Sequence, residues 1–241
     1  MLKTGRLYGV GVGPGEAELI TIKAARVIND SPVIAIPKSA DSSADGRSKA
    51  LVIVEQLIAL DAKEILELDF PMTRDKDALL ASRAKAAGAI CLHLKAGRDV
   101  VFITLGDPLF YSTFGCLVPF VRQAAPEAVI EAVPGVTSFC ASAAAAMMPI
   151  AEAGESVAVI PAAYDLEDVR AALSAFDTVI LMKVNKVIDK VVALLIETGL
   201  ERKAVFVSRA GWSEERVVTD VASLKGEVLD YFSLIIIRKG T

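Results

Sequence analysis

Residues 9–19, GVGVGPGEAEL, place a glycine-rich loop between a short apolar run and a helical pattern. Leu7 and Tyr8 open this segment as a strand, and glycines occupy positions 9, 11, 13 and 15. A strand, a glycine loop and a helix in this order begin many α/β folds, and such loops often bind nucleotides at the carboxyl edge of a sheet. The spacing of the glycines tests whether this loop is of that kind.

The loop fails the tests for the two common phosphate-binding fingerprints. In the dinucleotide pattern G-x-G-x-x-G, the last glycine falls on Pro14 when the count starts at Gly9 and on Glu16 when it starts at Gly11. No Lys-Ser or Lys-Thr follows the glycines, which excludes a P-loop. Pro14 also lacks a backbone N–H, and a glutamate at the start of a helix repels anions.

Two interpretations of the loop therefore remain. It is either a tight turn without a ligand or a site for an adenosine-like ligand that carries no phosphate. S-adenosylmethionine (SAM) fits the second description, because its sulfonium is a cation and needs no basic groups around it. The loop alone does not decide between these interpretations.

Composition narrows the function classes. The chain has 241 residues, of which 54% are hydrophobic and 6% aromatic, so it can bury a large aliphatic core. A net charge of −4 argues against a nucleic-acid-binding protein. The longest nearly apolar run, residues 139–151, is too short to span a bilayer, which needs about 20 residues. We expect neither nucleic acid nor membrane as a partner.

The cysteines and the single histidine do not form a metal pattern. Cys91, Cys116 and Cys140 lie far apart, and His93 falls within a predicted helix, where we interpret it as a packing or surface residue. We expect no metal site and free thiols in a reducing compartment. Because the N-terminus passes almost directly into a strand, we expect no signal peptide and a cytoplasmic protein.

Short apolar runs alternate with helical periods through the first half of the chain. This alternation predicts a parallel sheet covered by helices on both faces. The predicted strands are residues 7–12, 33–37, 64–70 and 99–106, and the predicted helices are residues 16–30, 48–60, 78–97 and 112–124.

The second half also alternates, but it ends differently. Pro126 and the run that follows mark the expected start of a second domain, which divides the chain into residues 1–125 and 126–241. Residues 215–218 (ERVV) and 233–237 (SLIII) are expected to pair antiparallel, which would make the second sheet mixed. The remaining predicted strands are residues 155–162, 177–183 and 203–211, and the predicted helices are residues 136–148, 166–176 and 187–199.

Two further strand ends carry polar loops. Residues 105–113 read LGDPLFYST, in which Gly106 permits unusual backbone angles and Asp107 precedes a proline that favours extended backbone. Residues 133–139 read VPGVTSF and place Thr137 and Ser138 in the first turn of a helix. Taken singly, the first is more often a turn and the second a helix cap.

Together the three loops resemble, in order and spacing, the tetrapyrrole (precorrin) methyltransferase family. TVILMKVNK, SRAGWSEERVV and YFSLIIIR extend the resemblance over essentially the whole chain. FPMTRD at residues 70–75, with LGDPLFYSTF and RAGWSEERVV, is most similar to the enzymes that methylate carbon 20 of precorrin-2 or of its cobalt-containing counterpart, cobalt-factor II. Whether the substrate carries cobalt stays open.

The resemblance implies a fold, a cofactor and an assembly. It implies two α/β domains, with a mostly parallel N-terminal sheet, a mixed C-terminal sheet, and the active site in the cleft between the domains. It also implies a homodimer, and SAM as methyl donor with S-adenosylhomocysteine as product. The positions that match cofactor contacts of the family are Pro14, Leu105, Gly106, Asp107, Phe110, Ser112, Thr113, Thr137, Ser138, Met182, Ala210, Phe232, Ser233 and Leu234.

The chemistry needs alignment more than a reactive side chain. A reduced tetrapyrrole supplies a nucleophilic ring carbon, so the protein must hold that carbon, the methyl group and the sulfur in line. We identify no catalytic base; Asp107 acts either electrostatically or by holding its loop. Because the substrate carries eight carboxylates, a local cationic rim is expected. Its candidates are Lys38, Arg74, Lys183 and Arg209.

Three alternatives remain beside methylation of carbon 20. The first is methylation of another tetrapyrrole position by the same family, with uroporphyrinogen or a later precorrin as substrate. The second is a nucleotide-binding or NAD-dependent protein. The third is a related diphthine synthase, which modifies a protein; FPMTRD and RAGWSEERVV favour the corrin branch over it.

Overall fold

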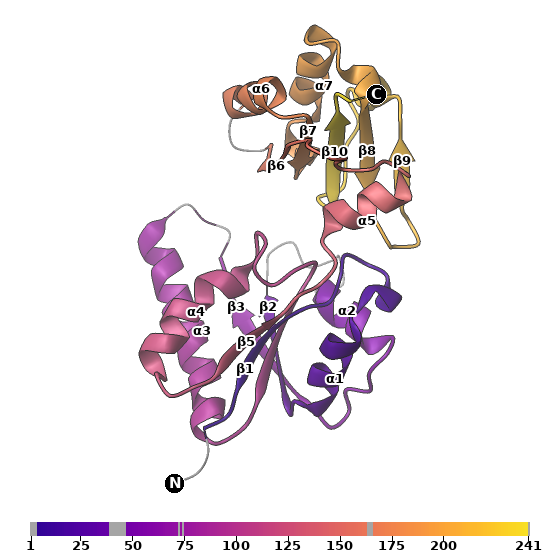
Figure 1. Ribbon diagram of the computed structural model, residues 1–241. Helices are drawn as coiled ribbons and strands as arrows, with labels where there is room; N and C mark the ends of the chain where they lie inside the picture. The colour runs from indigo at the N-terminus through magenta and orange to yellow at the C-terminus, as the bar shows by residue number, and fades with distance from the viewer. Residues whose placement is uncertain (1–3, 39–46, 72, 74, 163–165, 241) are drawn as a thin grey trace. The chain divides into compact units, whose positions relative to one another are not determined.

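The computed structural model folds into two compact units, Met1–Thr137 and Ser138–Thr241, and each contains one five-stranded sheet (Figure 1). The fold class predicted from the sequence, two α/β units, is confirmed. The structure describes residues 4–38, 47–71, 73, 75–162 and 166–240.

The sheet of the N-terminal unit is parallel throughout and has the order β3-β2-β4-β1-β5. Its inner strands are mostly apolar, as expected of strands that helices cover on both faces. All five residues of β4 are buried. The strands are β1 (Leu7–Gly11), β2 (Val33–Lys38), β3 (Glu64–Asp69), β4 (Val100–Thr104) and β5 (Ile130–Val133).

Helices α1 and α2 lie on one face of this sheet, and α3 and α4 lie on the other (Figure 1). Helices α3 and α4 lie together on one face, over a core in which Phe102 and Phe114 are fully buried. Side-chain caps fix where the helices begin: Thr21 caps α1, Asp75 caps α3 and Ser112 caps α4. The helices are α1 (Ile22–Asp30), α2 (Lys49–Glu55), α3 (Lys76–Lys95) and α4 (Thr113–Ala124).

The sheet of the C-terminal unit is mixed and has the order β6-β7-β10-β8-β9. Strand β10 runs antiparallel between β7 and β8. Helices α6 and α7 pack on one face and α5 on the other. The elements are α5 (Ser138–Ala145), β6 (Val157–Pro161), α6 (Leu166–Ala175), β7 (Thr178–Met182), α7 (Ile188–Glu197), β8 (Ala204–Ser208), β9 (Arg216–Val218) and β10 (Ser233–Arg238).

Two details of the predicted organisation are wrong. The expected second domain starts at residue 126, but β5 pairs with β1, so the segment up to Thr137 belongs to the first unit. The expected pairing of residues 215–218 with 233–237 also fails, because β9 pairs with β8 instead. The final strand enters the middle of the sheet, where its continuous apolar run is buried on both faces.

Across the residues that the structure describes, no helix is both long and apolar enough to cross a membrane.

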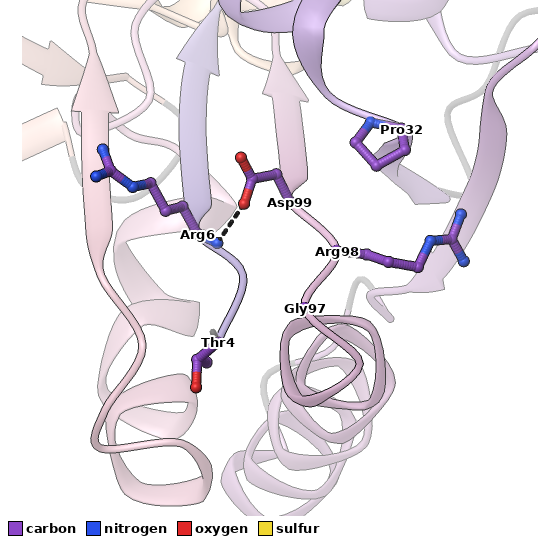
Figure 2. A pocket seen from close by; sticks show the side chains of 6 residues that line it. All are labelled: Thr4, Arg6, Pro32, Gly97, Arg98 and Asp99. Atoms are coloured by element: carbon purple, nitrogen blue, oxygen red, sulfur yellow. Dashed lines mark hydrogen bonds between the residues drawn. The ribbon is translucent and has the colours of Figure 1, made fainter. Parts of the chain in front are cut away.

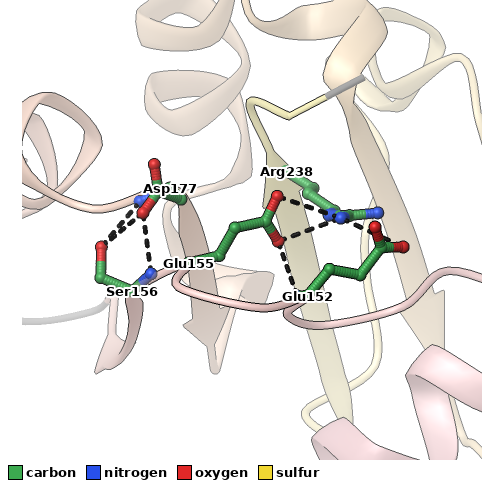
Figure 3. A network of polar contacts seen from close by, with 5 residues as sticks. All are labelled: Glu152, Glu155, Ser156, Asp177 and Arg238. Carbon is green, nitrogen blue, oxygen red and sulfur yellow. Dashed lines mark hydrogen bonds and ion pairs between the residues drawn. The ribbon is translucent and has the colours of Figure 1, made fainter.

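A polar network joins the ends of three strands in the C-terminal unit (Figure 3). The side chain of Arg238, which is 10% exposed, donates from Nη2 to both carboxylate oxygens of Glu155 at 3.1 and 3.0 Å. Glu152 lies 3.4 Å from the same guanidinium. Beside this pair, the carboxylate of Asp177 accepts hydrogen bonds from the backbone N–H and the hydroxyl of Ser156, at 2.7 and 2.8 Å. These contacts fix the loop that leads into β6.

The two hydrogen bonds from Ser156 lower the pKa of Asp177 below its usual value. The stability that they contribute is therefore complete above the unfolded-state pKa, about 3.9, and is lost as the pH falls through the lower folded-state pKa. We expect Ser156→Ala to lower the urea midpoint at pH 7, and the difference from wild type to shrink toward pH 2.5. Ser174→Ala, at an exposed helical serine, is the control. A deficit that does not depend on pH would contradict this account.

Candidate functional site

Three loops meet at the carboxyl edge of the N-terminal sheet, because β4, β1 and β5 are neighbours in it. The loop after β1 bonds to the loop after β4: Gly106 N–H donates to the Gly13 carbonyl at 2.8 Å, and Gly13 N–H to the Gly106 carbonyl at 3.4 Å. Val12 N–H adds a bond of 3.0 Å to the Thr104 carbonyl. Backbone hydrogen bonds thus join two motifs that are far apart in the sequence, the loop after β1 and the loop after β4.

The glycines of these loops allow this close packing. A Cβ on Gly11 would lie 2.3 Å from the Gly106 carbonyl oxygen, and one on Gly135 would lie 2.2 Å from the same atom. Gly106 itself has φ 65°, in the left-handed region that favours glycine. A Cβ on Gly9 would lie 2.2 Å from the ring of Phe114. We interpret the glycines at positions 9, 11 and 135 as required by packing within the protein.

This corrects part of the sequence-based interpretation. If the loop is a ligand site, its alternating glycines at residues 9–15 are explained by close approach of the ligand to the backbone. Gly9 instead makes room for an aromatic ring of the core, and Gly11 makes room for the loop after β4. The sequence pattern does not distinguish these causes, because either one leaves no space for a side chain.

Asp107 holds two of the loops together. Its Oδ1 accepts the N–H of Leu109 at 2.9 Å, which closes the turn after β4. Its Oδ2 accepts the N–H of Gly135 at 3.2 Å, which ties that turn to the loop after β5. Both carboxylate oxygens therefore have backbone partners. Of the two roles that the sequence leaves open, the geometry supports the loop-holding one.

We expect Asp107→Ala to loosen both loops without unfolding the chain. The N–H groups of Leu109 and Gly135 lose their acceptor, and hydrogen bonds to a charged group contribute about 1.5–3 kcal/mol each. Hydrogen exchange at these two amides should accelerate at least about tenfold. Exchange at the amides of β4 should stay slow. Wild-type exchange rates at the amides of Leu109 and Gly135 in the variant would show that Asp107 does not hold the two loops together.

The rest of the loop after β4 is anchored where α4 begins. The hydroxyl of Ser112 accepts the N–H of Phe114 and lies 3.3 Å from the hydroxyl of Thr104, whereas Thr113 is the first residue of α4. Leu105 directly follows β4. The other predicted cofactor positions of this unit are also at this edge: Pro14 lies buried in the first loop, Phe110 in the turn and Thr137 after β5.

A second group of predicted positions gathers at one edge of the C-terminal sheet. Lys183 N–H donates to the Ser233 carbonyl at 3.0 Å, and Arg209 N–H to the Phe232 carbonyl at 2.8 Å. These bonds hold the start of β10 between the ends of β7 and β8. Met182, Ala210 and Leu234 lie at the same edge, and Ser138 begins α5.

Lys183 and Arg209 have left-handed backbone, with φ 59° and 50°. Such conformations cost about 1–3 kcal/mol each in residues other than glycine and occur preferentially at functional sites. The backbone of both residues therefore serves to hold β10, whatever their side chains do.

The predicted cationic rim is only partly available. The guanidinium of Arg209 donates to Asp230 at 3.0 and 2.8 Å and to Glu214 at 2.9 Å. Asp230 in turn accepts the N–H of Phe232 at 2.8 Å, so Arg209 supports the loop before β10. The Nζ of Lys183 lies 5.6 Å from the ring centroid of Tyr231. Arg74 lies outside the described residues.

Lys38 ends β2 and is exposed, with its Nζ 3.6 Å from a carboxylate oxygen of Glu67. Surface pairs of this kind contribute little, so its ammonium can exchange partners.

His93 is held in place: Arg98 lies 3.2 Å from its Nδ1, and Glu64 lies 3.6 Å from its Nε2. Glu64 also accepts from Arg98, and this hydrogen bond lowers the pKa of Glu64. This is the structural role that we expected for His93.

The predicted cofactor positions include polar atoms that need partners. The hydroxyl oxygens of Thr137 and Ser233 are buried and have no hydrogen-bond partner among the described residues. Buried hydroxyls are normally hydrogen-bonded, so both positions suit a polar ligand. No group of three or more His, Cys, Asp or Glu side chains in the described part of the chain has a metal-binding arrangement.

Sequence reasoning missed residues whose role depends on distant partners. Gly135 lies within a quoted motif, but only its contact with Gly106 shows why it is a glycine. Asp230 has no motif, and its partner Arg209 is 21 residues away.

A hollow of about 440 Å³ lies where the N-terminal strands begin, at the sheet edge opposite the three loops (Figure 2). Thr4, Arg6, Pro32, Gly97, Arg98 and Asp99 line it. The side chains of Arg6 and Arg98 extend away from one another, and Asp99 accepts the backbone N–H of Arg6 at 2.7 Å. The two guanidinium groups therefore do not converge on one anion.

Comparisons with known proteins agree with the motifs. A family model for tetrapyrrole (corrin/porphyrin) methylases matches residues 6–225. The cobalt-precorrin-2 C(20)-methyltransferase of Salmonella typhimurium is 35% identical over 98% of this chain and 97% of that protein. The precorrin-2 C(20)-methyltransferase of a Sinorhizobium species is 31% identical over 97% of this chain and 95% of that protein.

A solved structure has the same fold. The uroporphyrin-III C-methyltransferase of Thermus thermophilus aligns with a TM-score of 0.67 and 25% identity, over 98% of this chain and 92% of that one. The family predicted from the sequence is confirmed: this chain belongs to the tetrapyrrole (corrin/porphyrin) methylases.

Proposed function

We propose that this chain is a SAM-dependent methyltransferase that acts on carbon 20 of precorrin-2 or of its cobalt-containing counterpart, in cobalamin biosynthesis. The observation that carries this proposal is the match, over nearly the full length of both chains, to relatives named for this reaction. Their names agree with the activity predicted from FPMTRD, LGDPLFYSTF and RAGWSEERVV. One relative is named for the cobalt-containing substrate and the other for precorrin-2, so the proposal covers both substrates.

The loops of the N-terminal unit would hold the cofactor. When bound, SAM would supply a methyl group on a sulfonium, and these loops would align that methyl group with the nucleophilic ring carbon of the substrate. Asp107 keeps the turn after β4 against the loop after β5 and so fixes the backbone groups around Gly106. The hydroxyls of Thr137 and Ser233 have no hydrogen-bond partner within the described chain. Both would form hydrogen bonds with the bound cofactor. The other predicted cofactor positions keep their assignment as part of this proposal.

Rigid positioning is the main contribution of these residues to the reaction. In-line displacement is sensitive to misalignment, and a shift of about 1 Å can cost about 100-fold in rate. Backbone hydrogen bonds and glycine contacts hold the loops more firmly than mobile side chains would. This accounts for a methyltransferase site without a nucleophilic triad.

For the carboxylates of the substrate we retain Lys38, Lys183 and Arg74 as candidates. Arg209 is the weakest of the four, because two carboxylates of the chain already occupy its guanidinium. The assembly is proposed to be a homodimer and the compartment the cytoplasm. All three cysteines are free thiols, which supports a reducing compartment.

The main alternative is another tetrapyrrole position, as in the Thermus enzyme named for uroporphyrin III. To decide, the purified protein is incubated with ¹³C-methyl-labelled SAM and, separately, with precorrin-2, its cobalt-containing counterpart and uroporphyrinogen. NMR of the products then locates the labelled methyl group. We expect label at carbon 20 with one or both of the first two substrates. Label only on uroporphyrinogen would overturn the proposal.

A further inference from the structure

The turn after β4 exposes three large apolar residues in a row. Leu109, Phe110 and Tyr111 are 63%, 37% and 55% exposed. Runs of this kind are avoided on soluble surfaces unless they have a function, because they favour aggregation. Of the large hydrophobic side chains that the described N-terminal unit exposes, only Phe110 and Tyr111 are aromatic.

The turn is held rigidly in a strained conformation. Tyr111 has φ 47°, a left-handed backbone that aromatic residues rarely adopt. Asp107 fixes the start of the turn through the N–H of Leu109, and Ser112 fixes its end by capping α4. The ring of Phe110 packs edge-on against the ring of Tyr111, with their centroids 4.8 Å apart. Strain that is maintained by such anchors is typical of functional sites.

We propose that the side chains of Leu109 and Tyr111 form a platform for the flat face of the tetrapyrrole substrate. This deepens the proposed function and rests on it. The turn belongs to the same loop as Gly106 and Asp107, at the edge where the three motifs meet. An exposed aromatic ring suits the apolar face of a macrocycle whose carboxylates lie at its periphery. Phe110, which the sequence predicts as a cofactor position, packs edge-on against Tyr111.

We propose that the tetrapyrrole, and neither of two other conceivable ligands, covers the platform. The cofactor or a second copy of this chain would also cover exposed apolar side chains. The experiment therefore measures affinity for each: the KM for the tetrapyrrole, the Kd for S-adenosylhomocysteine, and the oligomeric state by light scattering.

The informative variant is Tyr111→Asn, because asparagine removes the ring but tolerates left-handed backbone. We expect it to raise the KM for the tetrapyrrole about 10- to 30-fold, the loss expected when one large apolar side chain no longer covers the ligand. The Kd for S-adenosylhomocysteine should change less than about twofold, a negligible free energy. Tyr111→Phe keeps the ring and should raise KM less than Tyr111→Asn does.

Met147→Asn is the matched control, because Met147 is also a left-handed residue, with φ 50°, and is 88% exposed. It follows α5 in the C-terminal unit and should keep the wild-type KM. A wild-type KM in Tyr111→Asn would overturn the platform while leaving the proposed function intact.

Three other results would also overturn it. They are an equal loss of S-adenosylhomocysteine affinity in Tyr111→Asn, a changed oligomeric state in that variant, or an equally raised KM in Tyr111→Phe. If the wild-type protein methylates none of the tetrapyrroles, the proposed function falls first and the platform with it.

Discussion

Gly135→Ala is expected to lower kcat/KM for methyl transfer about 100-fold in a protein that remains folded, because the new methyl group displaces the site loops by a fraction of an ångström to an ångström. Its Cβ would lie 2.2 Å from the Gly106 carbonyl oxygen and 2.8 Å from the Gly11 backbone. None of these neighbours is a flexible side chain that could turn aside. The loops after β1, β4 and β5 must therefore move apart, and the Gly13–Gly106 bridge moves with them.

Two measurements separate this effect from simple unfolding. Calorimetric titration with S-adenosylhomocysteine measures the cofactor affinity of the site, and circular dichroism shows whether the protein is folded. Gly88→Ala is the control, since a Cβ there meets nothing within 4 Å and lies in the exposed part of α3. It should raise the free energy of unfolding by about 0.5–1 kcal/mol, as expected of alanine for glycine in a helix, with unchanged cofactor affinity. Wild-type affinity in Gly135→Ala would mean that the loop packing does not shape the site.

Much of the fold follows from periodicity. The strands at residues 33–38, 100–104 and 178–182 are short apolar runs bounded by polar or turn residues, and the sequence places each within a few positions. The two errors concern partners and not elements. The predicted boundary at residue 126 places β5 in the second domain because Pro126 resembles a boundary, but a parallel strand can return to its sheet after any helical connection. Strand pairing depends on long-range contacts that local pattern does not record.

The site divides in the same way. Motif spacing predicts that Gly106 and Asp107 belong to the site, and the strand order of the structure places their loop against the loop after β1. The sequence alone does not show why each position needs its residue type. Gly9 and Gly11 look alike in the sequence, yet one accommodates a core ring and the other a neighbouring backbone. Arg209 looked like a free cation because its partner Asp230 is distant in the chain.

Gly9→Ala is expected to lower the free energy of unfolding by about 3 kcal/mol, because a methyl group in the middle of β1 collides with the ring of Phe114. The added Cβ would lie 2.2–2.4 Å from three carbons of the Phe114 ring. Phe114 belongs to α4 and is 1% exposed in the core. Urea unfolding followed by circular dichroism measures the loss. This glycine lies in the same motif as Gly11, but its variant should fail by instability and not by a displaced site.

A double-mutant cycle identifies the collision as the cause. Phe114→Ala alone should cost about 3–5 kcal/mol for the cavity that it leaves. In that background the ring is gone, so adding Gly9→Ala should cost less than about 1 kcal/mol, which gives a coupling of at least about 2 kcal/mol between the two positions. Additive losses would show that Gly9 is needed for another reason, such as ligand approach. In that case the ligand-binding explanation of the glycine stretch would hold at Gly9, and packing within the protein would explain only Gly11.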